Sequence, residues 1–249
     1  MNPISLDGHF QSYFQIVPAR TLDMLERIFR IRYDVYCREF GYEKEEDCPG
    51  GLEHDDYDEA ALHCLIVHRE TGAGAGCIRL VVQPPDQPNF LLPMERFCAD
   101  SLTDPIWHPA RLPRSQIAEV SRLAVHTQFR RRLGESESPV GIAPAPDFNA
   151  EERRTFPLLS LALFYAGAAL MKKTQREHAF VMVEPRLTRR MLSLGLPFRQ
   201  IGEPMEYHGT RAGYYVQVQE VLDKIPDGLK SLYEFVFENL GTWENNDQA

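Results

Sequence analysis

An apolar stretch at residues 156–171 constrains the fold more than any other feature of the chain. It reads FPLLSLALFYAGAALM, which is shorter than the roughly 18–20 apolar residues that a membrane-spanning helix needs, and it contains Pro157 and Gly167. We therefore expect a buried helix and no membrane span. The basic pair Lys172-Lys173 suits the negative end of the helix dipole and predicts the helix C-terminus.

Strand-like and helical segments alternate around this stretch. Runs rich in β-branched and aromatic residues predict strands at 10–17, 62–68, 76–82, 117–125, 179–183 and 214–221. Apolar residues at helical spacing predict helices at 22–36, 156–173, 186–194 and 229–240. Thr21 is expected to cap the first helix, and a turn at 70–72 to close a hairpin. This order indicates a mixed α/β sheet with helices on both faces, in one domain spanning residues 1–249.

Charge and cysteine content exclude several function classes. The 249-residue chain has a formal net charge of -9, whereas general nucleic-acid binding needs a basic face that neutralises phosphates. Its five cysteines are odd in number and form no CxxC pair, so neither a disulfide framework nor a metal site is expected. The N-terminal residues lack the basic start and apolar run of a signal peptide, so we expect a soluble, cytoplasmic protein.

Two segments are expected to form loops. Residues 39–59 carry ten carboxylates against a single lysine. We expect Glu43, Glu45 and Glu46 to be solvated, whereas the closely spaced aspartates further on make the loop a candidate to fold over a site. Residues 130–154 are rich in Arg, Ser, Glu, Pro and Gly, which favours a mobile insertion over a packed element.

Four segments carry a resemblance to a known family. They are 32–42 (RYDVYCREFGY), 53–58 (EHDDYD), 76–80 (GCIRL) and 119–125 (EVSRLAV). In this order and spacing they resemble the acyl-homoserine-lactone synthases, the N-acyl amino acid synthases and, most of all, the acyltransferases associated with PEP-CTERM/exosortase systems. The resemblance covers roughly the first half of the chain. It implies a GNAT (acyl-CoA N-acyltransferase) fold, an acyl donor on acyl carrier protein or coenzyme A, and an amine acceptor.

Two departures from the family bear on the substrates. The lactone synthases commonly have Trp and Phe where this chain has Tyr42 and Tyr36, positions that line the acceptor pocket in that family. The acceptor therefore need not be S-adenosylmethionine. The chain also has no clear glycine-rich loop between Val125 and residue 156 to bind pyrophosphate through backbone N–H groups, which favours acyl carrier protein over free coenzyme A as donor.

Glu119 is the candidate general base, because a carboxyl group in an apolar strand has a raised pKa and an amine must lose a proton to attack. The alternative is a structural ion pair with Arg122 or Arg79. Strict strand alternation places Glu119 and Arg122 on opposite faces. The resemblance implies a β-bulge, which we expect near 121–123, where it would bring both residues to one site and provide a backbone N–H for the thioester oxyanion. Ser121 is a candidate to assist the leaving thiolate, or is an ordinary strand serine.

The resemblance also marks a larger set of residues as the frame of the substrate pocket. This set consists of Arg32, Tyr36, Tyr42, Asp55, Asp58, Arg79 and Arg122. We expect the two aspartates to pair with Arg32 and Arg79, more than to contact the acceptor's ammonium group directly.

A group of basic residues is a candidate surface for acyl carrier protein, which is strongly acidic and would be steered by local positive charge. Its members are Arg130, Arg131, Arg132, Lys172 and Lys173. The alternative is that these are solvated charges on loops.

Together these features predict an N-acyltransferase that resembles the N-acyl amino acid synthases. It would move a fatty acyl group from an acyl carrier protein or coenzyme A thioester to the α-amino group of a small amino-acid-type acceptor, with no tightly bound cofactor. The alternatives are an acyl-homoserine-lactone synthase that uses S-adenosylmethionine, and a non-catalytic GNAT-like domain that binds acyl chains or a carrier protein.

Overall fold

The computed structural model describes residues 6–130, 150–193 and 196–243, and the structural statements below refer to these residues. The insertion expected at 130–154 falls mostly on residues 131–149, outside the described residues. No helix in the described part of the chain is long and apolar enough to cross a membrane.

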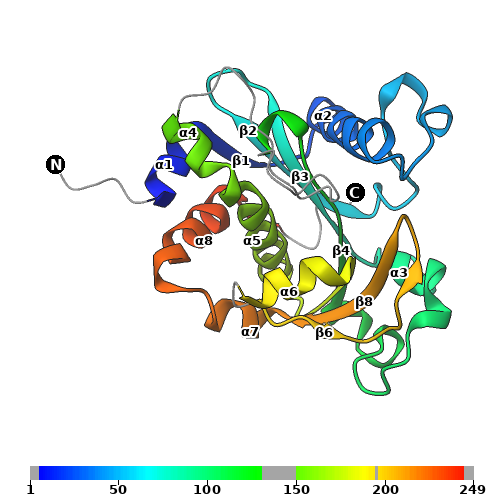
Figure 1. Ribbon diagram of the computed structural model, residues 1–249. Helices are drawn as coiled ribbons and strands as arrows, with labels where there is room; N and C mark the ends of the chain where they lie inside the picture. Colours follow the sequence, from blue (N-terminus) through cyan, green and yellow to red (C-terminus); the bar gives the residue numbers. More distant parts are fainter. Residues whose placement is uncertain (1–5, 131–149, 194–195, 244–249) are drawn as a thin grey trace.

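A mixed sheet forms the centre of the molecule, with the strand order β1-β2-β3-β4-β5-β8-β6 and with β7 paired to β8 (Figure 1). The strands are β1 Phe14–Pro18, β2 Ala61–His68, β3 Gly74–Val81, β4 Ile117–Val125, β5 His178–Val183, β6 Arg199–Gln200, β7 Met205–Glu206 and β8 Thr210–Gln217. All neighbours are antiparallel except β4 and β5, which are parallel. These two strands pair only from Ile117 to Glu119, so the sheet opens beyond that point.

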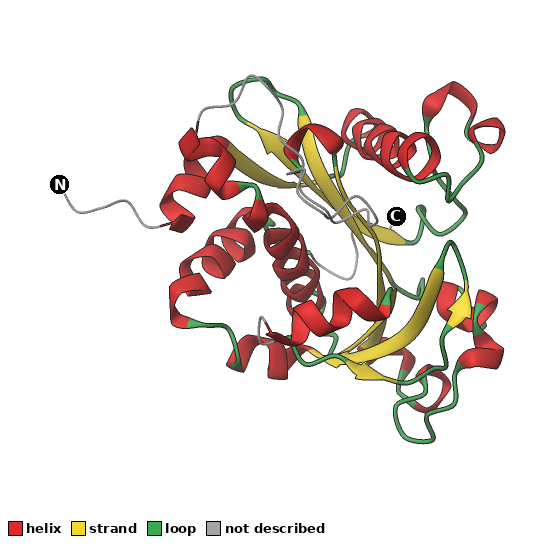
Figure 2. Cartoon of the chain, in the orientation of Figure 1, coloured by secondary structure: helices red, strands yellow, loops and turns green. Residues whose placement is uncertain are grey.

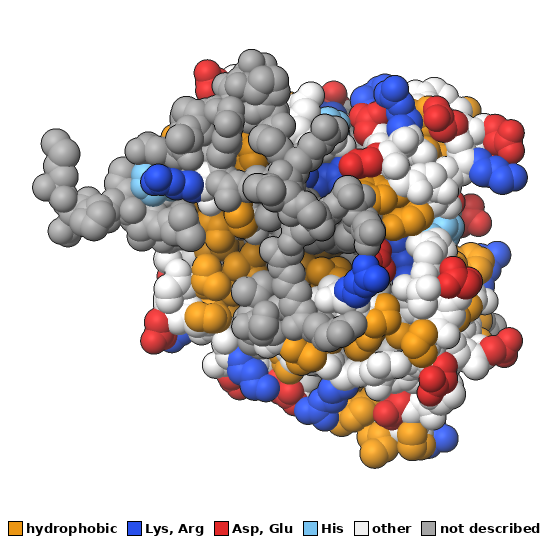
Figure 3. All heavy atoms as spheres, viewed as in Figure 1, with side chains coloured by type: hydrophobic (Ala, Val, Ile, Leu, Met, Phe, Trp, Pro, Cys, Tyr) orange, Lys and Arg blue, Asp and Glu red, His pale blue; other side chains and the backbone are white. Residues whose placement is uncertain are grey.

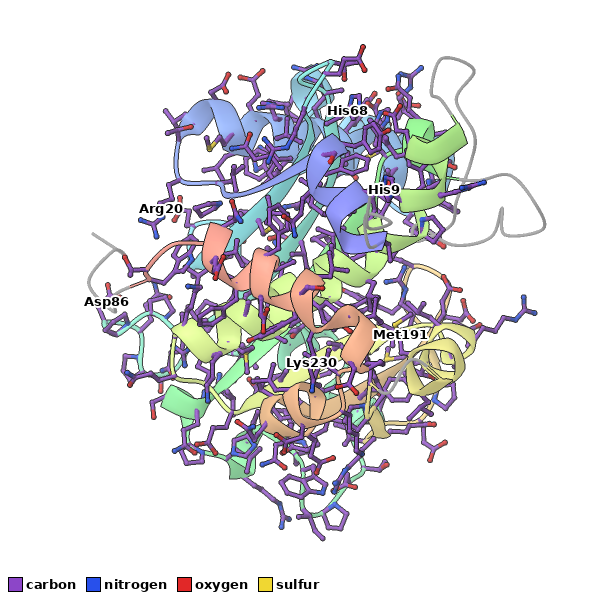
Figure 4. The ribbon with its side chains drawn as sticks, turned by 90° about the vertical axis from the view of Figure 1, so that its left-hand side faces the viewer. His9, Arg20, His68, Asp86, Met191 and Lys230 are labelled. Carbon is purple, nitrogen blue, oxygen red and sulfur yellow. The ribbon has the colours of Figure 1, made fainter. Side chains whose placement is uncertain are left out.

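One face of the sheet is covered by the apolar helix predicted from the sequence. This helix, α5 (Pro157–Lys173), packs on β3 and β4, and α8 (Asp227–Asn239) packs on α5 (Figures 1 and 2). Seen from this side, α8 with Lys230 and α1 with His9 lie in front of the sheet (Figure 4). The other helices packed with α5 and α8 are α1 Leu6–Tyr13, α4 Ala150–Thr155, α6 Pro185–Ser193 and α7 Val218–Asp223.

The opposite face is covered by α2 (Leu22–Arg32), which continues into a π-helix, Tyr33–Glu39. Thr21 caps α2 as predicted, since its hydroxyl accepts a hydrogen bond from the Met24 N–H at 3.3 Å. Ile28 and Ile31 face the sheet, whereas acidic and basic side chains are interspersed on the outer surface of α2 and the loop after it (Figure 3). The short helix α3, Pro93–Phe97, lies on the same face nearer β5.

The predicted hairpin, central strands and long helices are confirmed, but two boundaries are wrong. The strand expected at 10–17 begins only at Phe14, because residues 6–13 form α1. Phe10 enters the core from this helix and packs against Phe14 and Phe235, with ring centroids 5.1 and 6.3 Å apart. The last strand ends at Gln217, and the residues after it form α7.

The β-bulge predicted near 121–123 is present. Between the Cys77–Ala124 and Arg79–Ser121 pairs, β3 advances by two residues and β4 by three. Arg122 occupies the left-handed region, with φ of 51°. This conformation rotates its side chain to the face that Glu119 occupies, which strict alternation would forbid.

Candidate active site

A cavity of about 420 Å³ lies where β4 parts from β5. Its walls come from the acidic loop, β3 and β4, from α3, and from the turn that leads into β8. Seven of the nine residues predicted for catalysis and substrate binding line it: Arg122 and, beside it, Glu119, Ser121, Tyr36, Tyr42, Asp55 and Arg79. The other two, Arg32 and Asp58, pair with each other behind its wall.

Glu119 is the buried carboxyl group of this cavity, with 3% of its surface exposed. Its Oε2 accepts a hydrogen bond from the Met94 N–H at the start of α3, at 2.8 Å. Burial raises the pKa of Glu119 to about 8, although the Met94 N–H and Arg79 act in the opposite direction. No ion pair joins Glu119 to any described residue, so the structural alternative of a pair with Arg79 or Arg122 is not what this arrangement shows.

Arg32 is fully buried at the end of α2 and forms the base of an ion-pair network. Its guanidinium donates to both carboxylate oxygens of Asp58, at 2.7 and 3.1 Å, and to Glu53. Burial alone would raise the pKa of Asp58, but Arg32 and Arg79 hold it well below its usual range. The paired form is therefore ionised, and the network fastens the acidic loop to the sheet.

Arg79 extends this network toward the cavity. Its Nη1 donates to Asp55 at 2.5 Å and to Asp58 at 2.9 Å, as the sequence predicted for these aspartates. Its Nε donates to the Ser121 hydroxyl at 3.1 Å. Because an arginine has no acceptor, Ser121 must accept in this contact, and its own hydroxyl hydrogen points elsewhere.

Arg122 connects the bulge to the acidic loop through three carboxylates. It lies 3.1 Å from Glu53, 3.2 Å from Glu43 and 3.2 Å from Asp55. The expectation that Glu43 is solvated is therefore wrong, because the loop folds back and places it against Arg122. Glu45 and Glu46 are exposed as expected.

Tyr36 and Tyr42 form an aromatic side of the cavity. The Tyr36 hydroxyl donates to the Leu123 carbonyl at 2.7 Å, so the π-helix is tied directly to the bulge. Their rings stack with centroids 6.4 Å apart, and the Arg211 guanidinium lies 5.1 Å from the Tyr42 ring centroid. Burial raises the pKa of both tyrosines, so both are neutral hydroxyl groups at physiological pH.

A second, narrower cleft of about 70 Å³ follows the opening between β4 and β5 toward α5 and α6. Its walls are mainly apolar and include Val120, Leu123, Phe164, Val181, Val183 and Leu187. Tyr36, Ser121, Arg122, Met182 and Arg211 line both this cleft and the larger cavity. The two spaces therefore adjoin at the bulge.

The basic residues predicted to bind a carrier protein include three that the structure describes, and these three do not share one surface. Arg130 is only 3% exposed and pairs with Glu39. The expectation that it lies on the surface for a carrier protein is therefore wrong. Lys172 and Lys173 lie at the far end of α5, beside Gln219 and Phe237. Phe129 packs against Phe156 at the start of α5, so the neighbouring Arg130 lies at the opposite end of this helix from Lys172 and Lys173. At 1.5 Å per residue, the two ends are roughly 24 Å apart. Arg131 and Arg132 lie outside the described residues.

Several site residues were not predicted. One of them is Glu53, which pairs with both Arg32 and Arg122. It is the first residue of the motif at 53–58, and this position in the motif could have identified it as a site residue. The helix start Pro93-Met94-Glu95, with proline in the first turn, could have been recognised between the strands predicted at 76–82 and 117–125. No local pattern indicated the cavity residues Tyr207, His208 and Arg211, because the pairing of β8 with β5 brings this segment to the site.

Comparisons with known proteins agree with this architecture. Residues 31–136 match the sequence profile of a family described as Acetyltransferase (GNAT) domain. The chain is similar in structure to the AHL synthase LasI, with a TM-score of 0.58 and 14% identity over 86% of this chain and 95% of that chain. It is also similar to FeeM, an N-acyl amino acid synthase from uncultured soil microbes, with a TM-score of 0.53 and 16% identity over 85% and 94% of the two chains.

The CoA-dependent acyl-homoserine lactone synthase MesI is a further similar structure, with a TM-score of 0.53 and 19% identity over 92% of this chain and 97% of that chain. Among proteins with curated descriptions, none matches this chain by sequence. Structural likeness at such identities establishes the fold alone. The predicted fold is thus confirmed: this chain has the GNAT fold.

Proposed function

We propose that this protein is an N-acyltransferase that moves a fatty acyl group from a thioester donor to the α-amino group of a small amino-acid-type acceptor. The observation that carries this proposal is Glu119, a buried carboxyl group without an ion-pair partner among the described residues, facing the cavity where the sheet opens. Burying a carboxyl group without a charged partner lowers the stability of the fold, and titratable groups in such environments are concentrated at functional sites.

The acceptor amine must be neutral to attack the thioester carbonyl. The ionised form of Glu119, which predominates above its raised pKa of about 8, removes one proton from the acceptor's ammonium group. The amine nitrogen then bonds to the carbonyl carbon, and the carbonyl oxygen takes the negative charge. When the carbon–sulfur bond breaks, the amide nitrogen loses its remaining extra proton and the thiolate gains one.

The bulge supports stabilisation of this oxyanion. Arg122 and Leu123 have no paired residue on β3, and β4 has already left β5 at this level. We assign the backbone N–H groups at this bulge as the donors to the oxyanion, with the conformation fixed by the Tyr36 hydroxyl on the Leu123 carbonyl. Ser121, held by Arg79, directs its hydroxyl hydrogen to the departing thiolate.

The apolar cleft favours an acyl chain as the group transferred. The cleft meets the polar cavity at the bulge. The acyl chain of a thioester would lie in the cleft, and its carbonyl group would then lie at the bulge, next to the cavity that Glu119 lines. A similar structure, the CoA-dependent acyl-homoserine lactone synthase BjaI, was solved with SAM and isopentyl-CoA. Coenzyme A is therefore a donor to test beside acyl carrier protein, and the link to PEP-CTERM/exosortase systems stays a prediction.

The proposal is tested by measuring thiol release from acyl-CoA and acyl carrier protein thioesters of matched chain length, with the common L-amino acids and S-adenosylmethionine as acceptors. Mass spectrometry of the products identifies the amide. We expect N-acyl amino acids. Acyl-homoserine lactones would overturn the assigned acceptor, and thioester binding without any product would show an acyl-binding domain instead of an enzyme.

A further inference from the structure

The larger cavity contains two arginines that form no ion pair with a carboxylate in the described part of the chain. Arg79 and Arg122 are fully engaged with Asp55, Asp58, Glu53 and Glu43. Arg211 and Arg96 also line the cavity, and neither forms an ion pair with any described residue. Arg211 is half-buried, whereas Arg96 is exposed.

Both side chains are held by contacts that leave their cationic ends available. The Arg211 Nε donates to the His208 carbonyl at 3.2 Å, and its guanidinium lies over the Tyr42 ring. The Arg96 guanidinium lies 5.3 Å from the centroid of the Phe97 ring. Aromatic faces position a guanidinium without cancelling its charge, and the planar group binds carboxylates through two parallel hydrogen bonds.

We infer that Arg211, assisted by Arg96, binds the carboxylate of the acceptor, so that the acceptor is a zwitterionic amino acid and not a simple amine. This inference rests on the proposed acyl transfer and adds the residues that determine its specificity. It does not involve the ion-pair network, whose arginines already have carboxylate partners.

The register of the sheet gives the acceptor an orientation. Glu119 is level with Phe180 on β5, and Phe180 is level with Tyr215 on β8. Arg211 lies four residues before Tyr215, two strands away from Glu119, so the two side chains approach the cavity from different strands and levels. Glu119 is the deeper of the two, since it is almost fully buried. The amino group therefore points inward to Glu119, and the carboxylate stays nearer the opening at Arg211.

The apolar cleft offers the main competing role for Arg211, because this residue lines the cleft as well. In that role, the Arg211 guanidinium would bind the acyl donor, the molecule that carries the thioester, and not the acceptor. Most of the cleft is apolar, however, whereas the polar groups that would surround an amino acid lie on the cavity side.

The experiment compares each amino acid with its α-carboxamide, a neutral group of nearly the same shape. For the wild type we expect kcat/KM to be about 10- to 100-fold higher with the carboxylate, the size of a charge-assisted hydrogen bond in a partly buried site. Arg211→Gln should abolish this preference through the acceptor KM, Arg211→Lys should retain part of it, and Arg96→Gln should weaken it. Comparing the ratio between variants removes the effect of the amide on the basicity of the amine.

Arg199→Gln is the matched control, because Arg199 pairs with Glu220 at the surface and lines neither space. It should leave the preference unchanged. A wild type that acylates amides as well as acids, or an Arg211→Gln variant that retains the preference, would overturn the inference. A rise in donor KM in place of acceptor KM would assign Arg211 to the donor and overturn it too.

Calorimetric titration of amino acids and their amides without donor separates this inference from the proposed function. Binding that requires the carboxylate and Arg211, without acyl transfer, would leave the inference standing and refute the proposed function. Absence of such binding would refute the inference, whether or not amines are acylated.

Discussion

The polar cavity and the apolar cleft share a boundary at the β4 bulge but differ in almost every other respect. The cavity has a volume of about 420 Å³ and is surrounded by carboxylates, arginines and tyrosines, several of them fixed in ion pairs. The cleft has a volume of about 70 Å³ and is mainly apolar. The same parting of β4 from β5 creates both, so one opening separates a site suited to a charged substrate from one suited to a chain.

The two regions also differ in how they are held together. The cavity wall depends on directional, charged contacts between the acidic loop and the sheet, whereas the cleft depends on the packing of α5 and α6. Variants that distinguish charge from packing should therefore affect the two regions separately.

The largest effect is expected for Glu119→Gln, which keeps the shape of the side chain and its acceptor for the Met94 N–H. Loss of the base should lower kcat/KM by about 10²- to 10⁴-fold. Steady-state kinetics with circular dichroism as a check of folding measure this. Glu46→Gln, at an exposed carboxylate, serves as control. Full activity of the Glu119 variant would remove the base role.

Arg32→Met should be the most destabilising change in the ion-pair network behind the cavity wall, because it leaves Glu53 and Asp58 buried without their main partner. Breaking a buried pair costs about 3–5 kcal/mol, measured as the free energy of unfolding in urea. Arg30→Met is a matched control on the same helix, where the exposed arginine pairs with Glu26. If both variants unfold alike, the network does not hold the loop.

The pH dependence should reveal opposite behaviour of Glu119 and the network. Since burial raises the pKa of Glu119 to about 8, kcat/KM should rise about tenfold per pH unit below that value and level off above it. Its protonated form stabilises the fold at low pH, and this contribution is lost as pH rises through 8. Asp58 has a lowered pKa, so its contribution is present above its ordinary pKa and lost as pH falls.

A profile of kcat/KM against pH, and unfolding curves at several pH values, check these signs. In Glu119→Gln the inflection of the activity profile near pH 8 should disappear. An unchanged inflection in that variant would assign the titration to another group.

Filling the cleft should affect the donor and not the acceptor. Leu187→Trp narrows the cleft from α6, so kcat/KM for long acyl thioesters should fall by about tenfold or more while acetyl transfer is retained. Leu192→Trp, on the same helix but 51% exposed, is the control. An equal loss with all chain lengths would show that the cleft does not hold the chain.

The smallest effect is expected at the boundary of the two regions. Tyr36→Phe removes the hydrogen bond to the Leu123 carbonyl and should cost about 0.5–1.5 kcal/mol of unfolding free energy, with a several-fold fall in kcat. Tyr33→Phe, which removes a hydroxyl that donates to the exposed Glu45, should change neither. A Tyr36 variant with unaltered kcat would show that the bulge keeps its conformation without this contact.

Much of the fold could be predicted from local patterns. Thr21 as a cap, the apolar helix α5 and the β2–β3 hairpin follow from rules that act within a few residues. The failures occurred where distant segments decide the outcome. Phe10 is helical because it packs against β1 and α8, and Glu43 is half-buried because the acidic loop returns to Arg122 on β4.

The sequence by itself determined most of the helices and strands and carried the resemblance. It also singled out the charged residues that lie in apolar strands or in the family motifs: Glu119, Arg32, Asp55, Asp58, Arg79 and Arg122. Only the tertiary structure decided their partners, the burial that raises the pKa of Glu119 and the arrival of Arg211 beside the same cavity. The physical reason is that spacing along the chain specifies local geometry, whereas desolvation and ion pairing depend on which distant segments the sheet brings together.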